Sequence, residues 1–117
     1  MRECGILLPV ASLPSRYGIG AFSKEAYEWI DSLKQAGQSV WQVLPFGPTG
    51  YGDSPYQSFS AFAGNPYFID LEQLIQEGLL TKAECDQADF GDSRRYISYD
   101  RIYEERFPLL KKAYERW

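Results

Sequence analysis

Two short apolar runs that flank an amphipathic segment constrain the fold most strongly, and they span residues 5–10 and 39–45. Each run has the length and composition of a strand that is buried on both faces. Between them, Ser23 is suited to cap a helix and Gly37 to end it. The apolar residues of that helix recur at helical spacing: Ala26, Trp29, Ile30, Leu33 and Ala36. A strand, a helix and a strand at this spacing predict a βαβ unit over residues 5–45, with parallel strands.

A long loop and further helices are expected after this unit. Residues 46–66 are rich in Gly, Pro, Ser, Tyr and Phe, and a loop of this length is usually functional or disordered. Its aromatic content argues against disorder. Residues 65–69 are expected to return to extended structure, and short helices are expected to begin at the capping residues Asp70 and Thr81.

The last segment has the pattern of a helix that faces the core. Its apolar stripe consists of Ile102, Tyr103, Phe107, Leu110, Ala113, Tyr114 and Trp117. Pro108 is expected to kink this helix or to mark its first turn. The charged residues Arg101, Glu105 and Arg106 are expected to form a solvated face.

Composition excludes several classes of site. The 117 residues include no histidine, which removes Ser-His-Asp and Cys-His nucleophile systems and imidazole-ligated metals. Twelve basic against sixteen acidic residues give a net charge of -4, which argues against a nucleic-acid or anionic-membrane partner. Cys4 and Cys85 fit no metal spacing, and a disulfide and two free thiols both remain open. We expect no metal site and no cofactor.

The apolar segments also bear on location. The longest of them, residues 5–11, is interrupted by Pro9 and is far too short to span a membrane. Residues 1–4 lack the apolar region of a signal peptide. The chain is therefore predicted to be soluble and cytoplasmic, with no membrane partner.

The loop at residues 47–58 holds the residues best suited to bind a ligand. It follows the carboxyl end of the second predicted strand, the edge where α/β proteins bind ligands. Its tyrosines offer flat faces with a polar tip, and short polar groups suit sugar hydroxyls: Asp53, Ser54, Gln57 and Ser58. The alternative is an Ω-loop that packs on its own aromatics, and composition alone favours it.

Asp53 is the carboxylate in this loop that could act as an acid. A carboxylate-only glycosidic mechanism needs a second carboxyl about 5–10 Å away, and the sequence places none near Asp53. Asp-Ser-Pro is also a turn signature, so a turn role is the favoured interpretation of Asp53.

Two features predict that this sequence is a piece of a larger α/β protein. A βαβ unit with two or three strands cannot cover both faces of a parallel sheet. Trp117 also ends the chain with an apolar residue on the predicted stripe.

Several motifs resemble the opening segment of the 4-alpha-glucanotransferases (amylomaltase, or disproportionating enzyme). They are Gly5–Ser15, Ala36-Gly37-Gln38, Trp41–Pro45, the nearly unbroken block Gly47–Tyr67, and Ser98–Trp117. Phe46, where leucine is usual, departs from the pattern. The resemblance implies the N-terminal portion of a (β/α)8 TIM barrel with parallel strands. Its parts would be the first βαβ unit at 5–45, a glucan-binding loop at 46–66, and an inserted helical segment at 67–117.

The resemblance also implies a retaining double displacement that transfers α-1,4-glucan segments between maltooligosaccharides. The nucleophilic Asp, the acid/base Glu and a second Asp of that family match no residue here. No catalytic residue is therefore assigned, and this chain by itself is predicted to be inactive. Its expected partners are α-1,4-glucans and the missing C-terminal remainder of the barrel.

Binding residues are assigned by their positions in the matching motifs. Ser54 and Tyr56 match positions that line the donor–acceptor cleft, whereas Tyr51 and Tyr103 match aromatics of a second glucan site. Asp53 joins the substrate-binding candidates through its place in the same loop. Two alternatives remain: a non-catalytic α-glucan-binding module, and an inert barrel fragment that self-associates through its exposed sheet.

Overall fold

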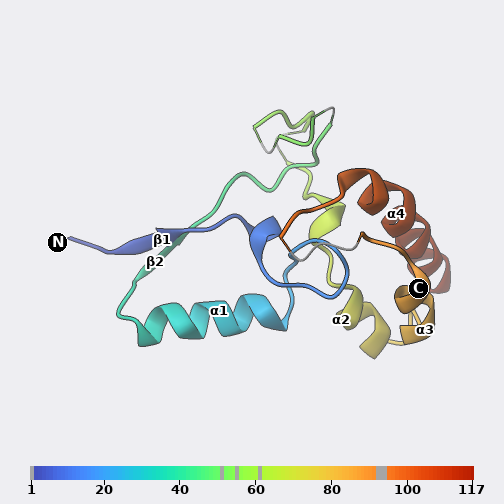
Figure 1. The fold of residues 1–117 in the computed structure, drawn as a ribbon, viewed down its shortest axis with the longest axis horizontal. Coiled ribbons are helices and arrows are strands. Elements are labelled where there is room, and N and C mark those ends of the chain that lie inside the picture. The colour runs from blue at the N-terminus through green and yellow to red at the C-terminus, as the bar shows by residue number, and fades with distance from the viewer. Residues whose placement is uncertain (1, 51, 55, 61, 92–94) are drawn as a thin grey trace.

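The computed structural model describes residues 2–50, 52–54, 56–60, 62–91 and 95–117. Strand β1 (Gly5–Leu7) pairs in parallel with strand β2 (Val40–Gln42), so that Gly5 lies opposite Val40 and Leu7 opposite Gln42. Helix α1 (Lys24–Gln35) connects them, which confirms the predicted βαβ unit. Figure 1 shows this unit at one end of the molecule and the remaining helices at the other.

Both strands are shorter and more exposed than the sequence predicts. Pro9 follows β1 and begins a 3-10 turn, η1 (Val10–Ser12), so the strand ends before it. Ile6 and Leu7 are 39% and 55% exposed, although the run was predicted to be buried on both faces. That prediction is wrong for this chain, because no other layer in its described part completes the cover that α1 begins. Parallel sheets elsewhere are covered on both faces.

Local capping signals account for the helix boundaries. Helix α1 begins after Ser23 and is followed by Gly37, whose φ of 77° lies in the left-handed region. Asp70 accepts a hydrogen bond from the Glu72 amide at the start of helix α2 (Leu71–Gln76). Residues 65–69 do not form the predicted extended segment. Asn65 instead caps the 3-10 turn η2 (Pro66–Phe68), and its side chain accepts from the Tyr67 amide at 2.9 Å.

The main core lies in the helical part of the chain, where α4 (Tyr99–Arg116) packs across α2 and α3 (Lys82–Gln87) (Figure 1). Its buried residues are Tyr17, Ile19, Tyr67, Leu71, Leu80, Cys85, Phe90, Ile102, Leu109 and Ala113. In a smaller cluster, Val10 and Leu13 pack against Ala26 of α1. Cys4 is exposed and Cys85 is buried, and both are free thiols.

The buried face of α4 differs from the predicted stripe. The side chains that point into the core are Ile102, Arg106, Leu109 and Ala113. Tyr103, Phe107, Tyr114 and Trp117 are exposed, so their predicted core role is wrong, and so is the solvated role predicted for Arg106. Helical spacing permits either of two overlapping stripes here. The choice between them depends on contacts with Tyr17 and Leu71, which lie far away in sequence. Pro108 lies inside the helix and not at its first turn.

None of the helices that the structure describes combines the length and the apolar composition of a membrane-spanning segment.

Glu84 joins α3 to α4 at the protein surface. It completes the predicted capping box with Thr81, and Arg116 donates to it at 2.7 Å. The Arg116 guanidinium, followed by the Thr81 amide, holds the pKa of Glu84 at about 2, below its ordinary 4.5. Because this folded-state pKa is depressed, the stabilisation is present above pH 4.5 and is lost as the pH falls through about 2.

Replacing Glu84 with Gln tests this charge. Glutamine can still cap the helix but cannot form the ion pair. We expect Glu84→Gln to lower the urea midpoint at pH 7 and to reduce the loss of stability between pH 4.5 and pH 2. Chemical denaturation followed by circular dichroism measures both. Glu77→Gln is the control, since that carboxylate accepts from the neutral Gln73 amide. A pH dependence in Glu84→Gln equal to that of the unaltered chain would contradict the assignment.

Candidate functional site

A groove runs between the long loop and the first half of α4, and we call it the loop–helix groove. Its volume is about 700 Å³. The loop and η2 contribute Pro48, Thr49, Gly50, Asp53, Phe59, Ala63, Gly64, Asn65, Pro66 and Tyr67. Helix α4 contributes Tyr99, Asp100, Tyr103, Glu104 and Phe107. The groove therefore joins segments about forty residues apart in sequence.

One wall of the loop–helix groove is aromatic. The ring centroid of Tyr67 lies 5.7 Å from that of Phe107 and 6.3 Å from that of Tyr99. Tyr103 packs on Phe107 at 5.2 Å in an edge-to-face arrangement and remains 63% exposed. Apolar ring surfaces with hydroxyl tips are therefore open to a ligand along this wall.

The polar groups of the groove include the carboxylates of Asp53, Asp100 and Glu104. Asp53 has a φ of 53°, in the left-handed region, and its amide donates to the Gly50 carbonyl at 3.0 Å. The Thr49 hydroxyl donates to its carboxylate at 3.1 Å. Asp53 therefore lies in a turn, as predicted, and its carboxylate accepts a hydrogen bond from the side chain of Thr49. Burial, and next the nearby Asp53 charge, raise the pKa of both Tyr67 and Tyr99. Both phenols therefore stay protonated at neutral pH and are able to donate a hydrogen bond.

The predicted binding residues separate into two places. Asp53 and Tyr103 both line the loop–helix groove. Ser54 is half-buried and its hydroxyl accepts from the Tyr56 amide at 3.3 Å, while the Tyr56 side chain is 72% exposed. Neither of these two residues lines the groove. Tyr51 lies outside the described residues.

Sequence reasoning missed four aromatics that line the groove: Phe59, Tyr67, Tyr99 and Phe107. A signal was present on the helix, because residues 99, 103 and 107 follow one another at a spacing of four and share a face. Tyr67 carries no comparable signal, since only the folded chain brings η2 against α4.

A smaller cavity of about 190 Å³ lies at the carboxyl ends of the two strands. Pro9 and Val10 line it after β1, and Leu44 and Pro45 line it after β2. Asp53 lines both this cavity and the loop–helix groove, as Tyr99 does. The loop therefore stands at the sheet edge where parallel α/β proteins bind ligands.

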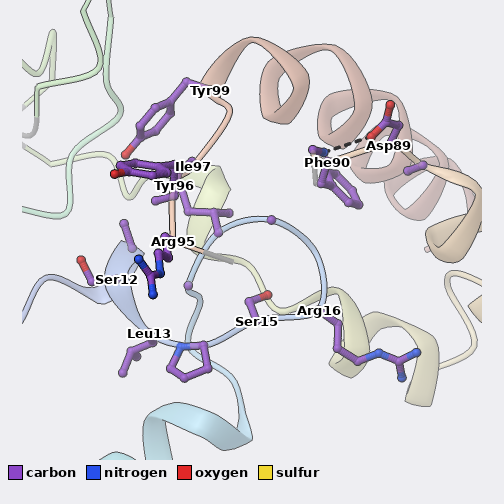
Figure 2. A pocket seen from close by; sticks show the side chains of 17 residues that line it. Ser12, Leu13, Ser15, Arg16, Asp89, Phe90, Arg95, Tyr96, Ile97 and Tyr99 are labelled. Carbon is purple, nitrogen blue, oxygen red and sulfur yellow. Dashed lines mark hydrogen bonds between the residues drawn. The ribbon is translucent and has the colours of Figure 1, made fainter. Parts of the chain in front are cut away.

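A further cavity, of about 850 Å³, lies between the loop at residues 11–20 and the segment that leads into α4. Figure 2 shows residues 12–16 along one side of it and residues 95–99 along another. Arg16, which borders this cavity, lies 3.9 Å from Asp86. Among the described residues, no group of three or more carboxylates and thiols has the arrangement of a metal site. The loop–helix groove, with its aromatic rings and the carboxylates of Asp53, Asp100 and Glu104, is better suited to a flat, hydroxylated ligand.

Comparisons with known proteins concern almost the whole chain. Residues 8–117 match a family model described as 4-alpha-glucanotransferase. A 4-alpha-glucanotransferase of Clostridium butyricum is 55% identical over 105 residues, which cover 90% of this chain and 22% of that relative. The Thermus thermophilus 4-alpha-glucanotransferase is 49% identical over 113 residues, covering 97% of this chain and 22% of the relative.

A solved structure agrees with these relatives. The amylomaltase from Streptococcus agalactiae in complex with acarbose superimposes with a TM-score of 0.94 at 43% identity. The match covers 98% of this chain and 23% of that one. The chain therefore spans between a fifth and a quarter of the length of these relatives.

Proposed function

Because the chain belongs to the 4-alpha-glucanotransferase family, we propose that it supplies substrate contacts in an enzyme that transfers α-1,4-glucan segments between maltooligosaccharides. The observation that carries this proposal is the family match over residues 8–117. The loop–helix groove supports it, because aromatic surfaces bind the apolar faces of sugar rings and carboxylates accept from their hydroxyls.

The two parallel strands would be the first strands of a (β/α)8 barrel. The exposed faces of the two strands and the helix α1 that connects them in parallel support this assignment. The loop at residues 46–66 would then stand at the carboxyl end of the barrel. Active sites of such barrels lie at that end.

Catalysis would be completed by carboxylates in a further part of the barrel. In a retaining double displacement, an Asp carboxylate attacks the donor and releases the leaving sugar, which a Glu protonates. The hydroxyl of an acceptor sugar then attacks the glycosyl group and displaces the Asp carboxylate, and the Glu takes up the proton of that hydroxyl. This chain would contribute Ser54 and Tyr56 near the scissile bond, Asp53 as a further substrate contact of the loop, and Tyr51 and Tyr103 at a second glucan site outside the cleft.

A chimera tests the proposal. Residues 8–117 replace the matching segment of the Clostridium butyricum enzyme, and the chimera and the 117-residue chain are each incubated with maltotriose. We expect glucose and longer maltooligosaccharides from the chimera and no product from the chain alone. A folded but inactive chimera would contradict the proposal.

The other outcomes separate the alternatives. A product ladder from the chain alone, free of host enzyme, would place a catalytic carboxylate within it, and Asp53→Asn would be the first variant to examine. An inactive chimera with a chain that binds maltoheptaose in calorimetry would indicate a non-catalytic binding module. Concentration-dependent sedimentation without a sugar response would indicate an inert barrel fragment.

A further inference from the structure

Arg106 is the most deeply buried charged side chain in the described part of the protein, with 1% of its surface exposed. Its Nη1 donates to the Tyr17 carbonyl at 3.4 Å, and its Nη2 donates to the Ile69 carbonyl. Within the described residues its Nε has no hydrogen-bond partner. Burial lowers the pKa of Arg106 to about 10, and the Asp70 carboxylate opposes that effect in part.

One of the two carbonyls, that of Ile69, belongs to a segment that α4 must meet to form the loop–helix groove, and the Tyr17 carbonyl belongs to the loop at residues 11–20. Ile69 directly follows η2, which carries Tyr67. Arg106 is next to Phe107 on α4 and one turn from Tyr103. The guanidinium therefore joins α4 to Ile69, the residue that directly follows η2.

Burial by itself does not explain an arginine at this position. An apolar side chain of similar volume fills a core without the desolvation of a charge, and replacing buried charges in this way is often neutral or stabilising. What an apolar residue lacks is the planar fork of donors, which fixes two acceptors at a defined separation and direction.

We propose that Arg106 is a positioning residue that holds α4 against η2 and so sets the spacing of the aromatic rings in the loop–helix groove. The part of this proposal that concerns ring spacing is argued only from the contacts of Arg106. The consequence for glucan binding also rests on the proposed function of the groove.

Three variants of the 117-residue chain isolate the donors from the packing. Arg106→Met keeps most of the volume and removes every donor. Arg106→Lys keeps the charge but replaces the fork with one ammonium group. Leu109→Ala removes buried volume from the same face of α4. The Leu109 side chain has no donor, so this variant leaves the hydrogen bonds of Arg106 in place.

The first measurement needs no ligand. Nuclear Overhauser cross-peaks between the rings of Tyr67 and Phe107 report their contact at a temperature where every variant is folded. We expect these peaks to be lost in Arg106→Met, to be partly restored in Arg106→Lys, and to persist in Leu109→Ala. Peaks that persist in Arg106→Met, or that are lost equally in Leu109→Ala, would overturn the proposal.

The second measurement is calorimetric titration with maltoheptaose, with Tyr103→Ala as the direct-contact reference. We expect Arg106→Met to bind roughly tenfold more weakly than the unaltered chain, and Leu109→Ala to bind as tightly as it does. Equal affinity of the unaltered chain, Arg106→Met and Leu109→Ala for maltoheptaose would overturn the link to binding. If the unaltered chain does not bind while the cross-peaks change as expected, the glucan assignment fails and the positioning role of Arg106 stands.

Discussion

Replacing Ile102 with Ala is expected to lower the free energy of unfolding by about 2–5 kcal/mol. Ile102 is fully buried on α4 and packs in the main core. The space around it is tightly occupied, because a Cβ built on Gly18 would lie 2.7 Å from the Ile102 Cδ1 atom. Gly18 has a φ of 86°, in the left-handed region that favours glycine, so this position supplies no side chain that could fill the cavity.

Urea denaturation followed by circular dichroism measures this loss. Domains of this size are stable by only about 5–15 kcal/mol, so Ile102→Val provides a milder second variant with an expected cost of about 0.5–1.5 kcal/mol. Tyr114→Ala on the exposed face of the same helix is the control and should change stability by less than about 0.5 kcal/mol. Equal effects of Ile102→Ala and Tyr114→Ala would mean that the buried face of α4 is assigned wrongly.

The helix boundaries were predictable because their signals are local. Asp70 and Thr81 each start a helix by accepting a hydrogen bond from a free amide group, Ser23 precedes α1 without such a bond, and the glycines at 37 and 78 follow helix ends with positive φ. These interactions join residues within one turn of each other. They can therefore be inferred from spacing alone.

The register of α4 was not predictable in the same way. Its aromatic residues suggested a stripe through Tyr103 and Phe107, whereas the core is formed by the neighbouring stripe that contains Arg106. Arginine is accepted there because two backbone carbonyls, far away in sequence, lie within its reach. A pattern that scores only hydropathy assigns such a residue to solvent.

The candidate site was predicted in part for a related reason. The long loop was predicted from its composition, and Asp53 and Tyr103 were named as binding candidates from the loop and the family motifs. Both residues line the groove, and their roles in binding stay predictions. The opposite ring of Tyr67 reaches the groove through the 3-10 turn after Asn65, a segment expected to be extended. Ser54 and Tyr56 do not line the groove, so their roles in substrate binding remain predictions.

Tyr56→Ala in the chimera is expected to reduce kcat/KM for maltotriose by about tenfold, equivalent to about 1.4 kcal/mol of lost transition-state binding. The Tyr56 ring is exposed in this chain, so its removal should change the free energy of unfolding by less than about 0.5 kcal/mol. A loss of turnover without a loss of stability would then reflect a lost contact with the sugar. The neighbouring hydrogen bond from the Tyr56 amide to the Ser54 hydroxyl also survives the substitution, since it uses the backbone.

Two further variants give this experiment its resolution. Tyr56→Phe keeps the aromatic face and removes the hydroxyl, so it separates stacking from hydrogen bonding. Tyr27→Ala removes an equally exposed tyrosine from α1, outside every cavity described above. We expect Tyr27→Ala to leave kcat/KM unchanged and Tyr56→Phe to retain the stacking part of the activity. Kinetics of Tyr56→Ala that match those of the unaltered chimera would remove Tyr56 from the substrate contacts, and with it the assignment of this part of the loop to the scissile bond.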